Sequence, residues 1–322
     1  MDYQFQPNRP TVMYVDANNL YKRAFFAAES DKDKALEFLM NMAWNLRSTL
    51  KTEYLFAVFD GENSKESRLA FLPYYKANRL KDMNNEKVLE QEFREQEFKM
   101  LAKEALAALN FNVYESDYIE ADDVIGILTK RSAEKNWNVV CVSSDKDYNQ
   151  MCAYSPYVNI LNQQRKEVTH QGNFQTKLDI RPEQFTDYLA LVGDKADNII
   201  GIFKLGHKTA IKLLSQYNDI AGIKEHMPEI NGVKLVANLE EAFVTGRLER
   251  NKKAVSVLFE HQDKVKIDTQ NLKKTVMSMS DINRLNQFCK DHELESFRLR
   301  NLAQYYNITH GQSKPRQKHG MH

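Results

Sequence analysis

The stretch Ile119–Leu128, IEADDVIGIL, carries three carboxylates within four residues and an apolar run directly after them. The run predicts a helix, because its apolar residues recur at the spacing of one helical face. All three acids then fall in the first turn, where Glu120 and Asp123 share a face and Asp122 projects about 100° away. Acids at a helix N-terminus are also favoured by capping and by the macrodipole, so this stretch alone has a purely structural interpretation.

The composition indicates a soluble chain of 322 residues, long enough for two domains or one large one. No apolar run approaches the ~18 residues of a membrane helix, and Met1–Pro10 lacks the layout of a signal peptide. Cys141, Cys152 and Cys289 show no metal-ligand spacing, which favours a reducing compartment. We therefore expect a cytoplasmic protein, in the host cytoplasm if the source is viral. The net charge of +1 indicates no partner by itself.

Three further apolar segments end in acids, and each pattern indicates a buried strand. They are Thr11–Asp16, Tyr54–Asp60 and Asn138–Asp147. None alternates between apolar and polar residues, as expected when helices cover both faces of a sheet. Helical patterns separate them, most clearly at residues 33–51. The sequence therefore predicts an α/β fold with a central, mostly parallel sheet flanked by helices, whose ligands bind beyond the carboxyl ends of the strands.

Two more segments bring acids to the same edge. A strand pattern at Phe111–Tyr114 precedes Glu120, so the first turn of the Glu120 helix is expected to open at this edge. Later, Arg181–Val192 predicts a helix, and Gly193–Asn198 follows it with two acids three residues apart. From about residue 218 the pattern is helical and charged, without further strand signals.

Nine carboxylates are thus expected at one edge of the sheet. They are Asp16, Asp60, Glu120, Asp122, Asp123, Asp145, Asp147, Asp194 and Asp197. Like charges this close raise one another's pKa values, so these acids cannot all ionise unaided. Oxygen ligands without a His or Cys cluster indicate Mg²⁺ or Mn²⁺, and their number suggests two or more ions acting on a phosphodiester. The alternative is a set of solvated acids at strand ends.

Six motifs in order resemble those of the structure-specific 5′-nucleases, which include flap endonucleases, bacteriophage 5′–3′ exonucleases and the 5′-nuclease domain of bacterial family A DNA polymerases. They are VDAN at 15–18, FDG at 59–61, YKANR at 75–79, EADD at 120–123, SDKD at 144–147 and GDKADN at 193–198. The match spans roughly residues 11–300, and the chain's size is most similar to that of a phage enzyme. The resemblance implies that all nine acids belong to the metal site of a PIN-like nuclease core.

The resemblance also implies a helical arch above the metals, at about residues 62–100. There Lys76 and Arg79 would be catalytic and would contact the scissile phosphate; from the residues alone, a solvated helix end is the alternative. Tyr74 and Tyr75 would stack on an unpaired base, with Tyr75 as the expected DNA contact, or else would pack against the sheet. Because residues 64–85 are poor in apolar side chains, we expect them to bury little and to be mobile without DNA.

Residues 193–217 resemble a helix-hairpin-helix, which grips the duplex backbone through main-chain N–H groups. The expected DNA contacts are Gly206, Lys208 and Thr209. The family usually has Pro-Gly at the positions of Phe203 and Lys204, and glycine permits a backbone conformation that lysine disfavours. The turn geometry, and a K⁺ ion bound by the hairpin, are therefore left open.

We thus expect a nuclease domain at 1–185, a helical DNA-binding region at 186–310 and a disordered tail at 311–322. The implied function is a structure-specific 5′-nuclease, with flap endonuclease and 5′–3′ exonuclease action by a two-metal mechanism. It would use Mg²⁺, with Mn²⁺ as a substitute, on DNA with 5′ flaps, nicks or 5′ ends.

RNA–DNA hybrids, and hence RNA primers, are further substrates that the resemblance allows. It implies a monomer without a membrane association and leaves replication proteins open as partners. The alternatives are a catalytically weak DNA-binding relative, which the complete acid set and Lys76 disfavour, and a PIN-type ribonuclease, which the chain length disfavours.

Overall fold

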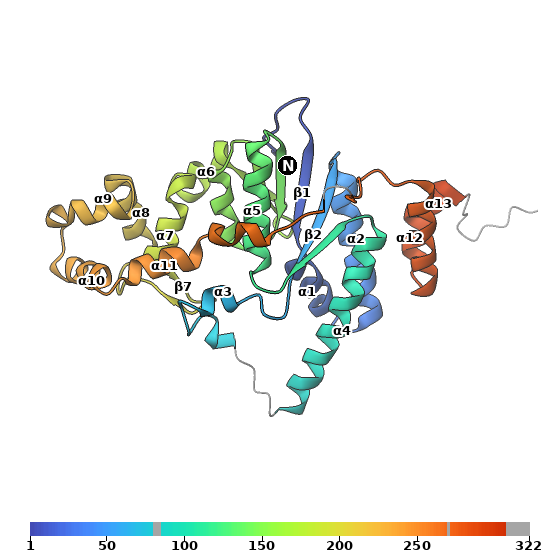
Figure 1. The fold of residues 1–322 in the computed structure, drawn as a ribbon, viewed down its shortest axis with the longest axis horizontal. Coiled ribbons are helices and arrows are strands. Elements are labelled where there is room, and N and C mark those ends of the chain that lie inside the picture. Colours follow the sequence, from blue (N-terminus) through green and yellow to red (C-terminus); the bar gives the residue numbers. More distant parts are fainter. Residues whose placement is uncertain (80–84, 269–270, 307–322) are drawn as a thin grey trace, which may run out of the picture.

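A six-stranded sheet with the order β3-β2-β1-β4-β5-β6 forms the centre of the computed structural model, which describes residues 1–79, 85–268 and 271–306 (Figure 1). The strands are β1 Thr11–Asp16, β2 Tyr54–Asp60, β3 Asn112–Ser116, β4 Asn138–Val142, β5 Val158–Asn162 and β6 Glu167–His170. Strands β1 to β5 pair in parallel, and β6 pairs antiparallel to β5. The prediction of an α/β fold with a mostly parallel sheet is confirmed.

Helices cover both faces of this sheet, which explains why its strands lack polar alternation. On β1, Met13 and Val15 pack into one core with α1, α2 and α4, whereas Val12 and Tyr14 pack into a second core with α5. These helices are α1 Ala17–Ala27, α2 Lys32–Thr49, α4 Glu86–Ala108 and α5 Ala121–Glu134. Each fully buried side chain of this kind contributes roughly 1.5–3 kcal/mol, so the strand residues fix the sheet between its two helical layers.

A third core joins the helices at one end of the molecule, around Leu191, Leu214 and Leu239 (Figure 1). The helices of this core are α7 Phe185–Val192, α8 His207–Tyr217, α9 Ile220–Glu225, η4 Met227–Glu229, α10 Val233–Val244 and α11 Arg247–Val255, and the short η3 Pro182–Gln184 directly precedes α7. The chain then returns to the sheet, where Val257 packs so closely on α5 that a Cβ on Gly126 would lie 2.4 Å from its Cγ2 atom. Only glycine allows this approach.

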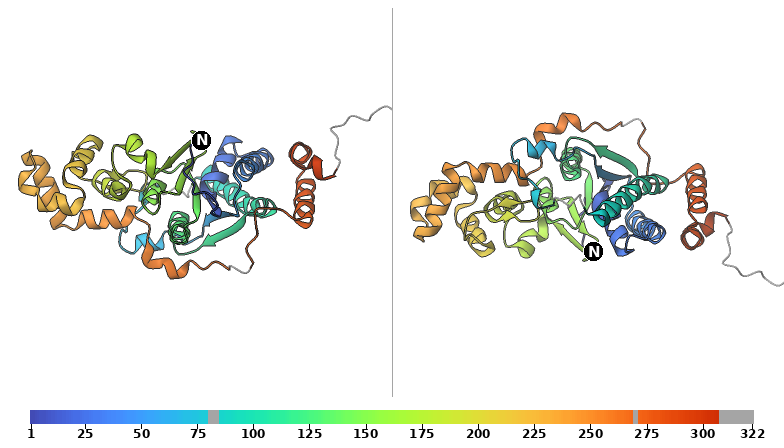
Figure 2. Two further views of the ribbon diagram at one scale, coloured as in Figure 1. Left: turned by 90° about the horizontal axis from the view of Figure 1, so that it is seen from above. Right: turned by 90° about the horizontal axis from the view of Figure 1, so that it is seen from below.

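The last two described helices, α12 Met279–Asp291 and α13 Glu295–Tyr306, lie at the opposite end from α8 to α10 in both views of Figure 2. They join the core of α2 and α4, where the rings of Trp44 and Phe297 meet edge to face with centroids 5.7 Å apart. The helical region expected at 186–310 is therefore divided between two packing sites. The tail expected at 311–322 lies outside the described residues.

Shorter elements complete the described chain. They are α3 Glu66–Leu69, η1 Ala77–Arg79, η2 Lys146–Ala153, α6 Gln171–Leu178, β7 Gly193–Asp194, β8 Ile199–Ile200 and η5 Phe259–Lys264. The sequence did not predict β5 and β6, which are short and carry polar residues such as Asn159 and Glu167. None of the helices in the described ranges has the length and apolar character needed to cross a membrane.

Candidate active site

The acids at the ends of β1 and β2 are held by neutral hydrogen-bond donors. Asp16 caps α1 and accepts from the backbone N–H of Asn19 at 3.0 Å and from the hydroxyl of Ser143 at 2.9 Å. Asp60 accepts from the backbone N–H of Ala121 at 2.7 Å, which ties the end of β2 to the first turn of α5. These bonds fix the carboxylates in place without cancelling their charge.

Asp145 and Asp147 follow β4, and Asp145 caps η2 by accepting from the backbone N–H of Asp147 at 3.0 Å. The tight turn between β7 and β8 adds Asp194 and Asp197. This turn requires glycine at its start, because Gly193 has a φ of +75° and a Cβ there would lie 2.3 Å from the backbone nitrogen of Gly201.

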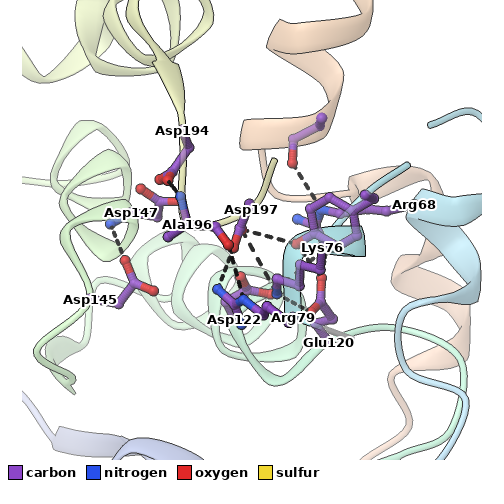
Figure 3. A network of polar contacts seen from close by, with 12 residues as sticks. Arg68, Lys76, Arg79, Glu120, Asp122, Asp145, Asp147, Asp194, Ala196 and Asp197 are labelled. Atoms are coloured by element: carbon purple, nitrogen blue, oxygen red, sulfur yellow. Dashed lines mark hydrogen bonds and ion pairs between the residues drawn. The ribbon is translucent and has the colours of Figure 1, made fainter. Parts of the chain in front are cut away.

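Six of the nine predicted acids line one cavity of about 510 Å³. They are Asp16, Asp60, Glu120, Asp122, Asp145 and Asp197. Asp147 and Asp194 lie beside Asp145, on one side of Asp197, while Glu120 lies on its other side (Figure 3). The structure thus gathers acids from five separate segments, as the sequence predicts.

Crowding of these acids in a buried place raises several of their pKa values. Burial, with repulsion from Asp60 and Asp145, raises the pKa of Asp16 to about 6. Burial, followed by repulsion from Asp145 and Asp194, raises the pKa of Asp147 to about 8. The site therefore holds more negative charge than its surroundings neutralise, which is the condition that a bound cation relieves.

The donor atoms of this cluster fit a divalent cation that prefers oxygen. The Oδ1 atom of Asp147 is buried and has no hydrogen-bond partner, and burial also raises the pKa values of Asp60, Asp122 and Asp197. Carboxylate oxygens are the ligands of Mg²⁺ and Mn²⁺. Yet across the described residues no three His, Cys, Asp or Glu side chains stand in a ready ligand arrangement. Basic side chains contact the oxygens of two of the cavity acids, Glu120 and Asp197.

Arg68 of α3 is the most enclosed of these basic side chains, with 3% of its surface exposed. Its guanidinium binds both carboxylate oxygens of Asp123, at 2.6 and 3.0 Å, and one oxygen of Glu120 at 3.0 Å. It also donates to the carbonyl oxygen of Ala254 at 2.9 Å, and Asp123 accepts in addition from the backbone N–H of Leu258. Both residues are thus fully engaged beneath the cavity.

Asp123, one of the predicted metal ligands, is paired with Arg68 in this structure. Glu120 and Asp123 share a face of α5, as predicted, but Arg68 covers that face, and Asp123 does not line the cavity. Asp122, which projects to another side of the helix, does line it. A role for Asp123 in holding an ion therefore stays a prediction.

Lys76 and Arg79, the two predicted catalytic cations, both line the acid cavity. The Lys76 Nζ atom lies 2.5 Å from an oxygen of Glu120 and 3.8 Å from one of Asp197. Arg79 contacts Asp197 with a guanidinium nitrogen at 2.5 Å. Although burial opposes it, Arg68 and Lys76 lower the pKa of Glu120, so this carboxylate is ionised in the ion-paired state.

Tyr75 does not have the exposure that stacking on a base requires. Its side chain is 3% exposed, and its hydroxyl donates to Glu120 at 2.8 Å and to Asp197 at 3.2 Å. In this conformation Tyr75 packs against the domain, which is the alternative that the sequence left open, and its DNA contact stays a prediction. Tyr74, with 43% of its surface exposed, is the neighbouring ring that solvent can reach.

The expectation of little burial across residues 64–85 is also wrong for its first part. Arg68, Leu72 and Tyr75 are all buried, and the last two belong to the core beside α5. The polar composition misled here because the segment buries a few large side chains against distant elements. Residues 80–84 lie outside the described residues.

The hairpin segment keeps a closed turn without the glycine that the family has there. Lys204 adopts a φ of +60°, and the N–H of Leu205 donates to the carbonyl of Ile202 at 3.0 Å. Gly206 caps α8, and Lys208 is exposed in its first turn. The DNA contacts predicted for Gly206, Lys208 and Thr209, and a K⁺ ion at the hairpin, stay predictions.

Besides Asn18 of the VDAN motif, four residues of α1 line the cavity but were not predicted. They are Asn19, Lys22, Arg23 and Phe26. Their spacing of three or four residues places them on one helical face that begins just after Asp16, so helical periodicity could have identified them. Arg68 had no such signal, because a single arginine in a polar segment is normally exposed.

Two family models match the chain one after the other. The model for the 5′-3′ exonuclease, N-terminal resolvase-like domain, matches residues 11–179, and the model for the 5′-3′ exonuclease, C-terminal SAM fold, matches residues 180–278. Together they cover the sheet, the acid cavity and the hairpin region.

Relatives with similar sequences include DNA polymerase I of Bacillus subtilis (strain 168), which is 32% identical over 244 residues. That match covers 72% of this chain but 26% of the polymerase, so the chain spans about a quarter of the length of such relatives. The 5′-3′ exonuclease of Aquifex aeolicus (strain VF5) is 29% identical, with 89% of this chain and 93% of the relative covered.

Among solved structures, the T5 D15 protein co-crystallized with metal ions has a similar fold, with a TM-score of 0.67 and 21% identity. The similarity covers 89% of this chain and 99% of that one. Because the family models match consecutive segments that together include the whole acid cavity, the chain belongs to the 5′–3′ exonuclease family of nucleases.

Proposed function

We propose that this nuclease is a structure-specific 5′-nuclease, which cleaves phosphodiesters near the 5′ ends of flapped or nicked DNA and trims 5′ ends as an exonuclease. The observation that carries the proposal is the cavity in which six carboxylates face Lys76 and Arg79. Acids alone would repel a nucleic acid, whereas this pairing supplies oxygen ligands and phosphate-binding cations at one place.

The residues that line the cavity would have different roles in phosphodiester hydrolysis. Divalent ions, Mg²⁺ or Mn²⁺ and two or more in number, would supply an activated water and stabilise the charge on the attacking and leaving oxygens. Asp16, Asp60 and Asp145 would hold them, because their hydrogen bonds to neutral donors leave the charge uncompensated. Lys76 and Arg79 would exchange their carboxylate partners for the scissile phosphate and orient it.

Arg68 would act as a positioning residue in this scheme. It holds Glu120 from below, through a guanidinium nitrogen 3.0 Å from one oxygen, while Lys76 contacts the other oxygen from the cavity side. Glu120 therefore keeps its orientation when Lys76 moves to a phosphate. The bidentate pair with Asp123 fixes Arg68 itself.

The finer features of the proposal concern substrates and partners. Gly206, Lys208 and Thr209 would contact the backbone of the duplex beside the flap, with a K⁺ ion at the hairpin as an option. RNA paired to DNA would also be cleaved, which would allow the removal of RNA primers. The protein would act as a monomer in the cytoplasm, alongside replication proteins.

Cleavage assays on three 5′-labelled substrates test the proposal: a 5′ flap, a nicked duplex and an RNA–DNA hybrid. We expect cleavage of the flap with Mg²⁺ or Mn²⁺, binding without turnover in Ca²⁺, and no cleavage in excess chelator. Lys76→Ala should bind the flap but lose most of its cleavage. Full activity in chelator would overturn the metal-dependent mechanism, and cleavage of RNA alone would favour a PIN-type ribonuclease.

A further inference from the structure

A groove of about 690 Å³ lies at the opposite end of the sheet from the acid cavity. Residues of α2, of α13 and of the segment 275–277 line it. Its lining also includes Thr11, at the start of β1, and Glu53, directly before β2. The cavity acids Asp16 and Asp60 end the same two strands. The length of the strands therefore separates the groove from the site proposed for cleavage.

Apolar side chains line this groove, and some of them reach solvent. Val276 has 84% of its surface exposed, and Tyr305 has 44%. Buried Ile282 and Leu302 and partly buried Trp44 also belong to the lining. Single apolar residues on a surface are common, but here they border one hollow. The groove therefore offers a place into which an apolar side chain of a partner fits.

Arg47 brings a positive charge to the groove without an acidic partner. Its guanidinium donates to the carbonyl oxygen of Leu109 at 3.1 Å and to that of Thr275. Both acceptors are neutral, and no carboxylate in the described ranges forms an ion pair with this side chain. Burial lowers the pKa of Arg47, because a partly buried cation loses hydration. A carboxylate that entered the groove would supply the missing charge compensation.

Two exposed cations, Arg9 and Lys51, add to this charge. Neither forms an ion pair with a carboxylate of the described chain. Among the described residues of the lining, Glu53 is the one acid, and Lys274 holds it at 3.1 Å. The groove therefore keeps an excess of positive charge around its apolar centre.

This combination fits an acidic peptide better than a nucleic acid. Single strands bind through successive stacked bases, and among the described lining residues Tyr305 is the one exposed aromatic ring. The Trp44 ring already contacts Phe297, with centroids 5.7 Å apart, and the guanidinium of Arg47, at 5.9 Å. A duplex presents a convex, polar backbone, which would leave the apolar hollow unfilled. Apolar side chains between carboxylates would match both parts of the groove.

We propose that this groove binds a short segment of a partner protein in which aromatic or branched aliphatic side chains alternate with Asp or Glu. The apolar side chains of the segment enter the hollow beside Val276 and Tyr305, and its carboxylates bind Arg47 and Lys51. Residues 307–322 of the chain itself carry three lysines or arginines and no acid, so they do not have this chemistry. The inference goes beyond the proposed function and does not depend on cleavage.

Fluorescence anisotropy with the full chain and labelled peptides of about twelve residues tests the inference. In one set, Phe, Trp, Leu or Ile alternate with Asp or Glu in varied order. A second set has Lys in place of the acids, and a third has Ser in place of the apolar residues. We expect binding by members of the first set and at least about tenfold weaker binding by the other two. No binding throughout the first set overturns the inference.

Two substitutions at the groove have matched controls elsewhere in the chain. Lys51→Glu should weaken binding of the acidic peptides about tenfold, whereas Lys166→Glu, at an exposed lysine between β5 and β6, should leave it unchanged. Val276→Asp should also weaken it about tenfold, whereas Val244→Asp, at an exposed valine of α10, should not. Because all four side chains are exposed, the Tm should stay near that of the parent. An equal loss of binding in the controls overturns the inference.

Three other outcomes would identify a different occupant and overturn the inference. The groove is a nucleic-acid surface if DNA displaces the peptides and Lys51→Glu weakens both ligands equally. It holds the chain's own end if a peptide of residues 307–322 binds as tightly as the acidic set. It is an interface between copies if Val276→Asp converts a dimer into a monomer in size-exclusion chromatography. Flap cleavage by the parent tests the proposed function separately.

Discussion

The two sides of the acid cavity hold their carboxylates by different means. The strand-side carboxylates, Asp16, Asp60 and Asp145, accept hydrogen bonds from neutral N–H or O–H groups. The arch-side carboxylates are Glu120 and Asp197 in the cavity and Asp123 beneath it, and each is ion-paired with an arginine or lysine. Burial with neighbouring acids raises the pKa of Asp16 to about 6, whereas Arg68 and Lys76 lower that of Glu120 against the effect of its burial.

This difference separates two tasks that one cluster of acids must perform. Neutral donors orient a carboxylate and leave its full charge for a cation that binds there. Cationic partners satisfy a carboxylate and in turn become fixed by it. In the proposed mechanism the strand side would hold the metal ions, and the arch side would store the basic groups that a phosphate can recruit.

The largest effect on stability is expected from a substitution at the buried centre of the arch side. Arg68→Ala removes a guanidinium that binds both oxygens of Asp123 and one of Glu120, and it leaves two buried carboxylates without that partner. Such a loss typically costs about 3–5 kcal/mol of unfolding free energy. Chemical denaturation of the parent and the variant measures it.

Arg79→Ala is the matched control, because this arginine pairs with Asp197 while its own side chain is about half exposed. An exposed pair contributes at most about 1 kcal/mol. If Arg68→Ala were no more destabilising than Arg79→Ala, the buried pair would not be the structural support of this side.

The two sides differ in how much of their structure can be predicted from the sequence. The strand-side acids follow continuous apolar runs, so their place at the sheet edge was predictable. Helical periodicity also placed Glu120 and Asp123 on one face of α5. It could not supply Arg68, which precedes Glu120 by 52 residues and reaches it only through the path of the folded chain.

The hairpin and the base of the arch also show the limit of prediction from local sequence patterns. Composition marked residues 64–85 as poor in apolar side chains, yet Leu72 and Tyr75 are buried through contacts with the core beside α5. At Lys204 the sequence indicated a conflict with the turn, and the structure resolves it by placing lysine in the left-handed region. Local patterns predict conformational preference, but only tertiary contacts determine where that preference is overridden.

The second expected effect compares one acid from each side with the same substitution. Asp145→Asn removes a charge from the cavity, so we expect flap cleavage to fall by more than about a hundredfold with little change in Tm. Asp123→Asn weakens the pair with Arg68, so its main effect should be a lower Tm, with a smaller loss of rate. Single-turnover cleavage and thermal unfolding of both variants measure this.

An equal loss of rate in the two variants, at unchanged Tm, would contradict the contrast. It would mean that Asp123 acts as a ligand in the same way as Asp145.

The third expected effect, smaller than these, concerns the competition between protons and metal ions for the strand-side acids and their neighbour Asp147.

Burial and neighbouring acids raise the pKa of Asp16 to about 6 and that of Asp147 to about 8, against an ordinary value of 3.8. A group whose pKa is raised on folding contributes stability below its ordinary pKa and loses it as the pH rises through the folded value. The metal-free protein should therefore lose Tm between about pH 4 and pH 8. Divalent ions bind the deprotonated carboxylates, so the gain in Tm from added Mg²⁺ should grow over the upper part of this range.

Thermal unfolding at several pH values, with Mg²⁺ or with chelator, measures both trends. Asp145→Asn should flatten both trends, because it removes one repelling charge. A gain from Mg²⁺ that is the same at pH 6 and pH 8 would show that these two acids do not exchange protons for metal, and that the uncompensated charge of the strand side lies elsewhere.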